Sequence, residues 1–161
     1  MKRKKILIAH LASNGDILYT SVLPKQIKLH DFPDAEITWA VSERCSQTLN
    51  NHPYIDHLIV VPVSGSDKME TIWEQFLITA GKENYDYIFP LQLINKNLVR
   101  YNRTIRNSVL GLYPYPIKVS LSPVVSLLPE EKTAVDDFVA ENAIHGYKNV
   151  VLVECSPLSA Q

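Results

Sequence analysis

Short apolar runs alternate with longer segments of helical periodicity along most of this 161-residue chain. The short runs predict buried strands, and segments whose apolar residues recur every three or four positions predict amphipathic helices. The predicted strands span 5–11, 36–41, 57–61, 85–91, 117–121 and 149–154. The predicted helices span 16–30 with a kink at Pro24, 43–50, 69–81, 96–110 and 129–143. This alternation is typical of the α/β class, so we expect a Rossmann-like open parallel sheet with helices on both faces.

The last predicted strand, 149–154, has few residues after it. A buried parallel strand normally leads into a helix that packs back on its sheet. We therefore expect a Rossmann-like domain over residues 1–146. Residues 147–161 are expected to be the start of a truncated second domain.

Charge and composition exclude several functions. Sixteen basic and 17 acidic residues give a net charge of −1, which provides no field for a polyanion, so nucleic-acid binding is not expected. Cys45 and Cys155 form no CxxC pattern, which favours a reducing cytoplasm. The five histidines lack metal-ligand spacing, so no metal site is expected.

The N-terminus combines basic residues 2–5 with an apolar run over 6–11. No small-residue cleavage site follows, so a buried first strand explains the run better than a signal peptide does. No apolar stretch approaches the length of a membrane span.

The turn over residues 13–16 (Ser-Asn-Gly-Asp) directly follows the first predicted strand. Ligands of open parallel sheets bind at the carboxyl ends of strands. Gly15 permits a tight turn and close approach of a ligand, and the helix dipole favours an ionised Asp16. Such a carboxylate can act as a general base toward an attacking hydroxyl, or it can simply cap the helix; the residues alone leave both open. The turn is not the GxGxxG dinucleotide fingerprint.

Several sequence segments together resemble the heptosyltransferase-like glycosyltransferases of family nine. The first segment is 5–24, which contains an apolar strand, a Ser-x-Gly-Asp turn and a helix with a proline; the others are 32–39, 53–56 and 85–88. The likeness runs from residue 5 to about 100 and fades over 101–145. It implies the N-terminal half of a GT-B fold.

The resemblance implies a bacterial, inverting transferase. It would move a sugar, heptose above all, from a nucleotide sugar such as ADP-heptose to a lipopolysaccharide-core acceptor, without a metal or other cofactor. The aspartate of the Gly-Asp turn is the family's proposed base, which falls on Asp16. Ser13, Asn14 and Gly15 would then line the acceptor side of the cleft.

The resemblance also points to two residues after the fourth predicted strand. Gln92 and Lys96 match a glutamine–lysine spacing found there in some members, and would bind substrate, although residues 93–95 depart from the usual small residues. The acceptor, a glycan or glycolipid, would be held by this domain and the nucleotide sugar by the second. Because residues 155–160 lack the glycine usual in the first donor loop, we expect the fragment alone to be inactive. The protein is expected to be cytoplasmic, with residues 2–5 hinting at peripheral contact with the inner face of the cytoplasmic membrane.

Two other functions were considered, and the role of three arginines stays open. One is a non-catalytic α/β module that binds a small anion or nucleotide at residues 13–16. A nucleotide-dependent oxidoreductase is disfavoured because the glycine pattern is missing and Asp16 would repel a phosphate. Finally, Arg100, Arg103 and Arg106 fall on one side of a predicted helix; they either meet acceptor phosphates or carboxylates, or form a solvated face.

Overall fold

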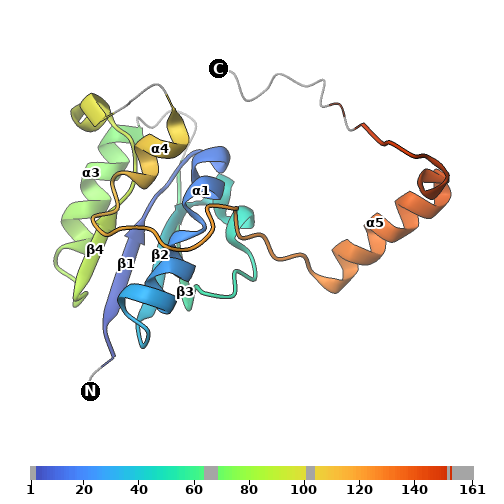
Figure 1. Cartoon of the computed structure of the whole chain (residues 1–161). Coiled ribbons are helices and arrows are strands. Elements are labelled where there is room, and N and C mark those ends of the chain that lie inside the picture. Colours follow the sequence, from blue (N-terminus) through green and yellow to red (C-terminus); the bar gives the residue numbers. More distant parts are fainter. Residues whose placement is uncertain (1–2, 64–68, 101–103, 152, 154–161) are drawn as a thin grey trace. The chain divides into compact units, whose positions relative to one another are not determined.

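A four-stranded parallel sheet in the order β3-β2-β1-β4 organises the N-terminal part of the chain (Figure 1). The computed structural model describes residues 3–63, 69–100, 104–151 and 153. The strands are β1 (Lys5–Ala9), β2 (Glu36–Ser42), β3 (His57–Val61) and β4 (Tyr87–Pro90). β1 lies between β2 and β4, with Ile8 opposite Trp39 on one side and Phe89 on the other. The central position of β1 explains its uninterrupted apolar sequence, because a parallel strand covered on both faces needs no polar face.

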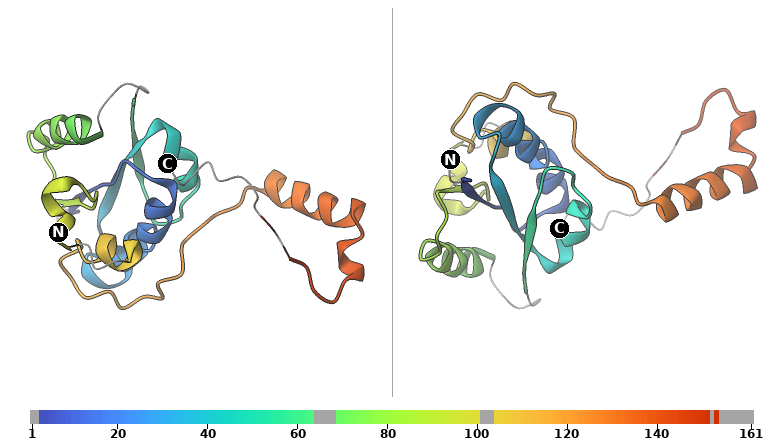
Figure 2. Two further views of the ribbon diagram at one scale, coloured as in Figure 1. Left: turned by 90° about the horizontal axis from the view of Figure 1, so that it is seen from above. Right: turned by 90° about the horizontal axis from the view of Figure 1, so that it is seen from below.

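Helices cover both faces of this sheet, as the sequence predicts (Figure 2). Side chains alternate along β1, so Ile6 and Ile8 pack in one core and Leu7 and Ala9 in another. The first core is closed by α1 (Asn14–Thr20), α2 (Leu23–Gln26), the π-helical turn η1 (Ile27–Asp31) and α4 (Ile105–Leu110). The second is closed by α3 (Met69–Ala80), through Trp73. Full burial of each large apolar side chain contributes about 1.5–3 kcal/mol.

Two predicted helices are broken into shorter pieces. The segment 16–30 divides into α1, α2 and η1, and Pro24 lies in the first turn of α2, where its missing N–H is tolerated. The helix begins at Asn14, two residues before the predicted start. The segment 96–110 forms the 3-10 helix η3 (Asn95–Arg100) and then α4. The segment 43–50 is also a 3-10 helix, η2 (Glu43–Leu49).

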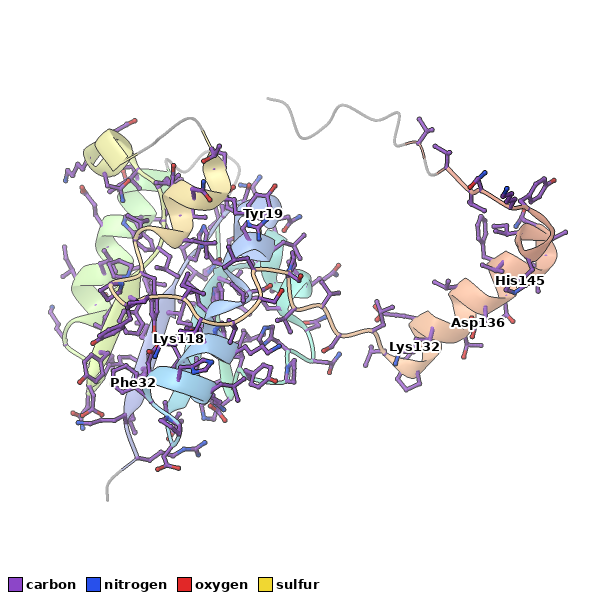
Figure 3. All side chains as sticks on the ribbon, viewed as in Figure 1. Tyr19, Phe32, Lys118, Lys132, Asp136 and His145 are labelled. Carbon is purple, nitrogen blue, oxygen red and sulfur yellow. The ribbon has the colours of Figure 1, made fainter. Side chains whose placement is uncertain are left out.

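The predicted strand at 117–121 is wrong. These residues belong to an extended segment, here called the strap (residues 116–124), which is held against the helices instead of joining the sheet. The backbone amides of Lys118 and Val119 donate to Gln26 Oε1 at 2.8 and 3.2 Å (Lys118 is labelled in Figure 3). A buried glutamine of α2 thus supplies partners that a neighbouring strand would otherwise provide.

The chain forms two compact units, residues 1–126 and 127–161. The second contains α5 (Pro129–Glu141) and the 3-10 turn η4 (Ile144–Gly146). Helix α5 begins as predicted at Pro129, and Glu131 Oε2 accepts the amide of the N-cap residue Leu128 at 2.7 Å, which is one half of a capping box. Residues 149–151 and 153 are not in a strand, and the rest of the predicted strand 149–154 lies outside the described residues. The domain boundary after residue 146 stays a prediction.

Candidate functional site

The segment after β1 enters α1 directly at the carboxyl end of the sheet. Ser13 is the N-cap of α1, and its carbonyl oxygen accepts the Ile17 amide at 2.9 Å. Gly15 and Asp16 therefore lie inside the first helical turn, with Asp16 at its third position. The residues that the sequence grouped as one turn thus come together at one helix end.

The Asp16 carboxyl group is half-buried, and its pKa is raised above the ordinary value. Burial is the main cause, because it penalises the charged form. The Ser13 backbone amide, which favours the carboxylate, acts in the opposite direction. The direction of this shift is opposite to the one expected from the helix dipole. Among the described residues, Asp16 makes no ion pair.

These contacts fit both of the roles considered for Asp16. An acid at the third helical position that engages the N-cap amide is one half of a capping box, so Asp16 does contribute to the start of α1. A carboxyl group with a raised pKa is also a stronger base once ionised, which suits proton abstraction near neutral pH. The two roles are compatible, because a carboxylate has two oxygens and several lone pairs.

Open space adjoins this acid at Gly15. A Cβ atom built there meets nothing within 4 Å, and the residue is exposed. Gly15 does not have a positive φ, so its backbone conformation does not require glycine. What its small size does provide is unobstructed access to the first turn of α1. Of its exposed neighbours, Asn14 accepts a hydrogen bond from Thr48 of η2 at 3.1 Å.

Gln92 is next to this segment but is bonded to its backbone. Its buried Oε1 accepts the amides of Leu11 and Ala12 at 3.1 and 3.0 Å. Its Nε2 donates to the Ala12 carbonyl oxygen at 2.7 Å. The side chain thus ties the end of β4 to the loop that precedes Ser13. These contacts give Gln92 a structural use, and its substrate-binding role stays a prediction.

Lys96 is not brought to the same place by any of its contacts. It lies on η3, is exposed, and its ammonium group pairs with Glu74 of α3. The hydrogen bond and charge of Glu74 raise the pKa of Lys96. The glutamine–lysine spacing therefore joins two side chains with different partners. The substrate-binding role of Lys96 also stays a prediction.

Of Arg100, Arg103 and Arg106, the structure describes the side chain of Arg106. Its Nη2 donates to the Leu121 carbonyl oxygen of the strap at 2.7 Å, and the side chain is half-buried. Arg106 is therefore not part of a solvated helix face. Arg103 and the side chain of Arg100 lie outside what the structure describes.

Two basic residues near the N-terminus form ion pairs. Arg3 pairs with Asp56 at 3.4 Å, and Lys4 pairs with Asp86 at 3.1 Å. Within the described ranges, no helix has the length and apolar character needed to cross a membrane.

One buried polar residue next to the site, His10, has no role in the sequence-based prediction. Its Nδ1 lies 2.9 Å from Thr20 Oγ1 on α1, and burial lowers its pKa to about 3, so the ring is neutral. The available signal was a histidine inside an otherwise apolar strand run. Periodicity alone does not reveal its partner on the next helix.

Comparison with known proteins agrees with the resemblance. No protein-family model matches the chain. Lipopolysaccharide heptosyltransferase 1 of Campylobacter coli is 33% identical over 104 residues, which are 65% of this chain and 30% of that protein. The crystal structure of a family 9 glycosyl transferase from Veillonella parvula superposes with a TM-score of 0.63 at 16% identity, covering 98% of this chain and 56% of the other. The chain is therefore similar to the heptosyltransferase-like glycosyltransferases of family nine, and it spans 30% of the length of the curated relative.

Proposed function

We propose that this chain is the acceptor-binding part of an inverting GT-B glycosyltransferase. The sugar, heptose by analogy with the Campylobacter coli relative, would come from a nucleotide sugar such as ADP-heptose and pass to a lipopolysaccharide-core acceptor. The observation that carries the proposal is the half-buried carboxyl group of Asp16, which has no ion pair among the described residues and lies beside the open space at Gly15. The fold and the sequence similarity support the same reading.

The reaction would be a single displacement at the anomeric carbon. The acceptor hydroxyl oxygen forms the new bond to that carbon as the bond to the nucleotide's phosphate oxygen breaks, and the nucleoside diphosphate leaves. Asp16 takes the hydroxyl proton. Its raised pKa makes the carboxylate a better proton acceptor than an exposed aspartate would be. No metal is required for this step, since the leaving group is already a good one.

Asp16 also favours this function over a module that binds a small anion. An anion placed at the first turn of α1 would meet the negative carboxylate, which would repel it. An acceptor hydroxyl meets the same group as a hydrogen-bond partner. We therefore retain the binding module only as the outcome expected if catalysis is absent.

The donor would be held by a second domain that begins near residue 147. Much of the rate of a two-substrate reaction comes from holding both reactants in position. We expect the 161-residue chain alone to bind acceptor without turning over a nucleotide sugar. Turnover by this chain would contradict that expectation.

Contact with the cytoplasmic membrane would come from the acceptor. Arg3 and Lys4 are paired with aspartates, so these two side chains have less free charge for anionic lipid. We expect a lipid-linked acceptor to bring the cytoplasmic enzyme to the inner face of the membrane.

The decisive test is Asp16→Asn in the full-length protein. Loss of a general base lowers kcat by about 10²–10⁴-fold, while acceptor binding and fold are retained. Glu43→Gln is the matched control, because Glu43 is an exposed acid in the first turn of η2, which follows β2. It should leave kcat unchanged. Near-normal turnover by Asp16→Asn would reduce Asp16 to a helix-capping residue and remove the chemical basis of the proposal.

A further inference from the structure

His10 is a buried polar group for which the proposed mechanism has no role. It follows β1, and its side chain has no exposed surface. The same is true of Thr20, the last residue of α1. The 2.9 Å contact between His10 Nδ1 and Thr20 Oγ1 therefore joins strand and helix inside the core.

The contacts of Thr20 extend this link to the first turn of α1. Its Oγ1 lies 3.1 Å from the carbonyl oxygen of Asp16 and 3.1 Å from that of Ile17. A carbonyl oxygen only accepts, so the hydroxyl hydrogen is directed toward the helix backbone. When the hydroxyl donates to one of these carbonyl oxygens, His10 Nδ1 is the donor to Thr20 Oγ1. One continuous chain of hydrogen bonds thus runs from the end of β1 to the backbone of Asp16.

The other ring nitrogen indicates that the imidazole does more than fill space. Within the described residues, His10 Nε2 is buried and has no hydrogen-bond partner. An unsatisfied buried polar atom destabilises a fold. A leucine of similar volume would occupy the position without that penalty. What the histidine adds is a polar ring that hydrogen-bonds Thr20 Oγ1 and also interacts with the backbone of Ala12.

We propose that His10 is a positioning residue for Asp16, acting through Thr20 to hold the first turn of α1 at a fixed place against β1. The inference rests on the proposed function, since it concerns the geometry of the proposed base. Gln92 holds the intervening loop at Leu11 and Ala12, so the two links restrain the segment on both sides of Ser13. Burial keeps the ring neutral, and the link therefore persists across the pH range of an enzyme assay.

Three variants separate this link from simple packing. His10→Leu and Thr20→Val remove it with little change of volume. His10→Asn is the conservative variant, because its amide nitrogen can lie near the position of Nδ1 and donate to Thr20. The matched control is His52→Leu, since His52 is also buried but bonds the Ser21 carbonyl oxygen, at the other end of α1, at 2.8 Å.

The first readout is the titration of the Asp16 side-chain carboxyl, followed by carbon-13 NMR in the 161-residue chain. In His10→Leu and Thr20→Val, the loosened first turn admits water, so the pKa of Asp16 falls toward that of an exposed aspartate. His10→Asn and His52→Leu should leave the titration close to that of the wild type. An unchanged titration in His10→Leu, or an equal shift in His52→Leu, would overturn the proposal.

The second readout is kinetic and uses the full-length protein. His10→Leu should lower kcat by about tenfold with an unchanged KM for the nucleotide sugar, because misplacement of the base affects only the chemical step. His10→Asn should restore most of that loss. A titration that responds to His10 while Asp16→Asn retains turnover supports the positioning link and rejects the transferase base. An unresponsive titration rejects the link, whatever the activity of Asp16→Asn.

Discussion

Replacing Gln92 by leucine tests whether this side chain is a clamp or a substrate ligand. The leucine keeps most of the volume but removes three hydrogen bonds, to the Leu11 amide, the Ala12 amide and the Ala12 carbonyl oxygen. Gln92 is 7% exposed, so water has little access to the site and cannot readily replace the lost hydrogen bonds. The loop between β1 and α1 would lose its tie to β4.

The expected loss of stability follows from these three groups. Each buried polar group left without a partner costs about 1–3 kcal/mol. Ala12 is only half-buried, so water can hydrogen-bond in part to its amide and carbonyl groups. The low end of the range therefore applies. The sum is about 3 kcal/mol, a large fraction of the roughly 5–15 kcal/mol by which a domain is normally stable.

Urea unfolding followed by tryptophan fluorescence measures this loss. Trp39 and Trp73 are buried in the two cores of the first unit, so the signal reports on that unit. With a slope of about 2 kcal/mol per molar urea, a change of 3 kcal/mol lowers the midpoint by about 1.5 M. The slope itself should not change, since the same surface is exposed on unfolding.

Lys96→Met is the matched control for this experiment. This substitution removes the other residue of the glutamine–lysine spacing. The ion pair between Lys96 and Glu74 is on the surface, so its loss should leave the midpoint unchanged. A Gln92→Leu midpoint equal to that of the wild type would refute the clamp and return Gln92 to the candidate substrate ligands.

Three further outcomes are expected. Gly15→Ala should stabilise the chain by up to about 1 kcal/mol, because its Cβ meets nothing and alanine favours a helix, yet it should raise the KM for acceptor if the open space is the acceptor site. Because folding raises the pKa of Asp16, the ionised carboxylate destabilises the fold at neutral pH. Asp16→Asn should therefore raise the urea midpoint at pH 7. This gain should vanish below the pKa that Asp16 has in the unfolded chain. For Asp56, burial raises the pKa, but the Ile37 amide and Lys28 lower it by more, so the pKa in the folded state is below its ordinary value. The ionised carboxylate therefore stabilises the fold above the unfolded pKa, and this contribution is lost as pH falls through the folded pKa. Asp56→Asn should flatten the acid limb of a pH–stability curve.

The sequence predicted the strands of the sheet well because buried parallel strands are short apolar runs between turn residues. The strap shows where that signal fails. Ile117 and Val119 alternate with polar residues as a half-buried strand would, but they pack against the core that α1 and α2 close, without joining the sheet. Alternation reports that one face is buried, not what covers it. No local pattern shows that Gln26 supplies the backbone partners.

The candidate site divides in the same way. The position of Asp16 could be predicted from a glycine–aspartate pair directly after an apolar strand. The raised pKa could not, because it depends on how much solvent the packed α1 excludes. The separate uses of Gln92 and Lys96 depend on partners that are 80 and 22 residues away in sequence, which spacing cannot reveal.

The strand order has a consequence for synthesis on the ribosome. β1 is made first, yet it pairs with β4 across a long stretch of sequence, with Ile6 beside Tyr87. Pairing over such a separation is slow, because the chain between must first be closed into a loop. β1, β2 and β3 can assemble earlier, leaving one side of β1 open until the fourth strand emerges. Gln92 follows that strand, so in a nascent chain the loop at Leu11 and Ala12 gains its hydrogen bonds to Gln92 only after the fourth strand has emerged.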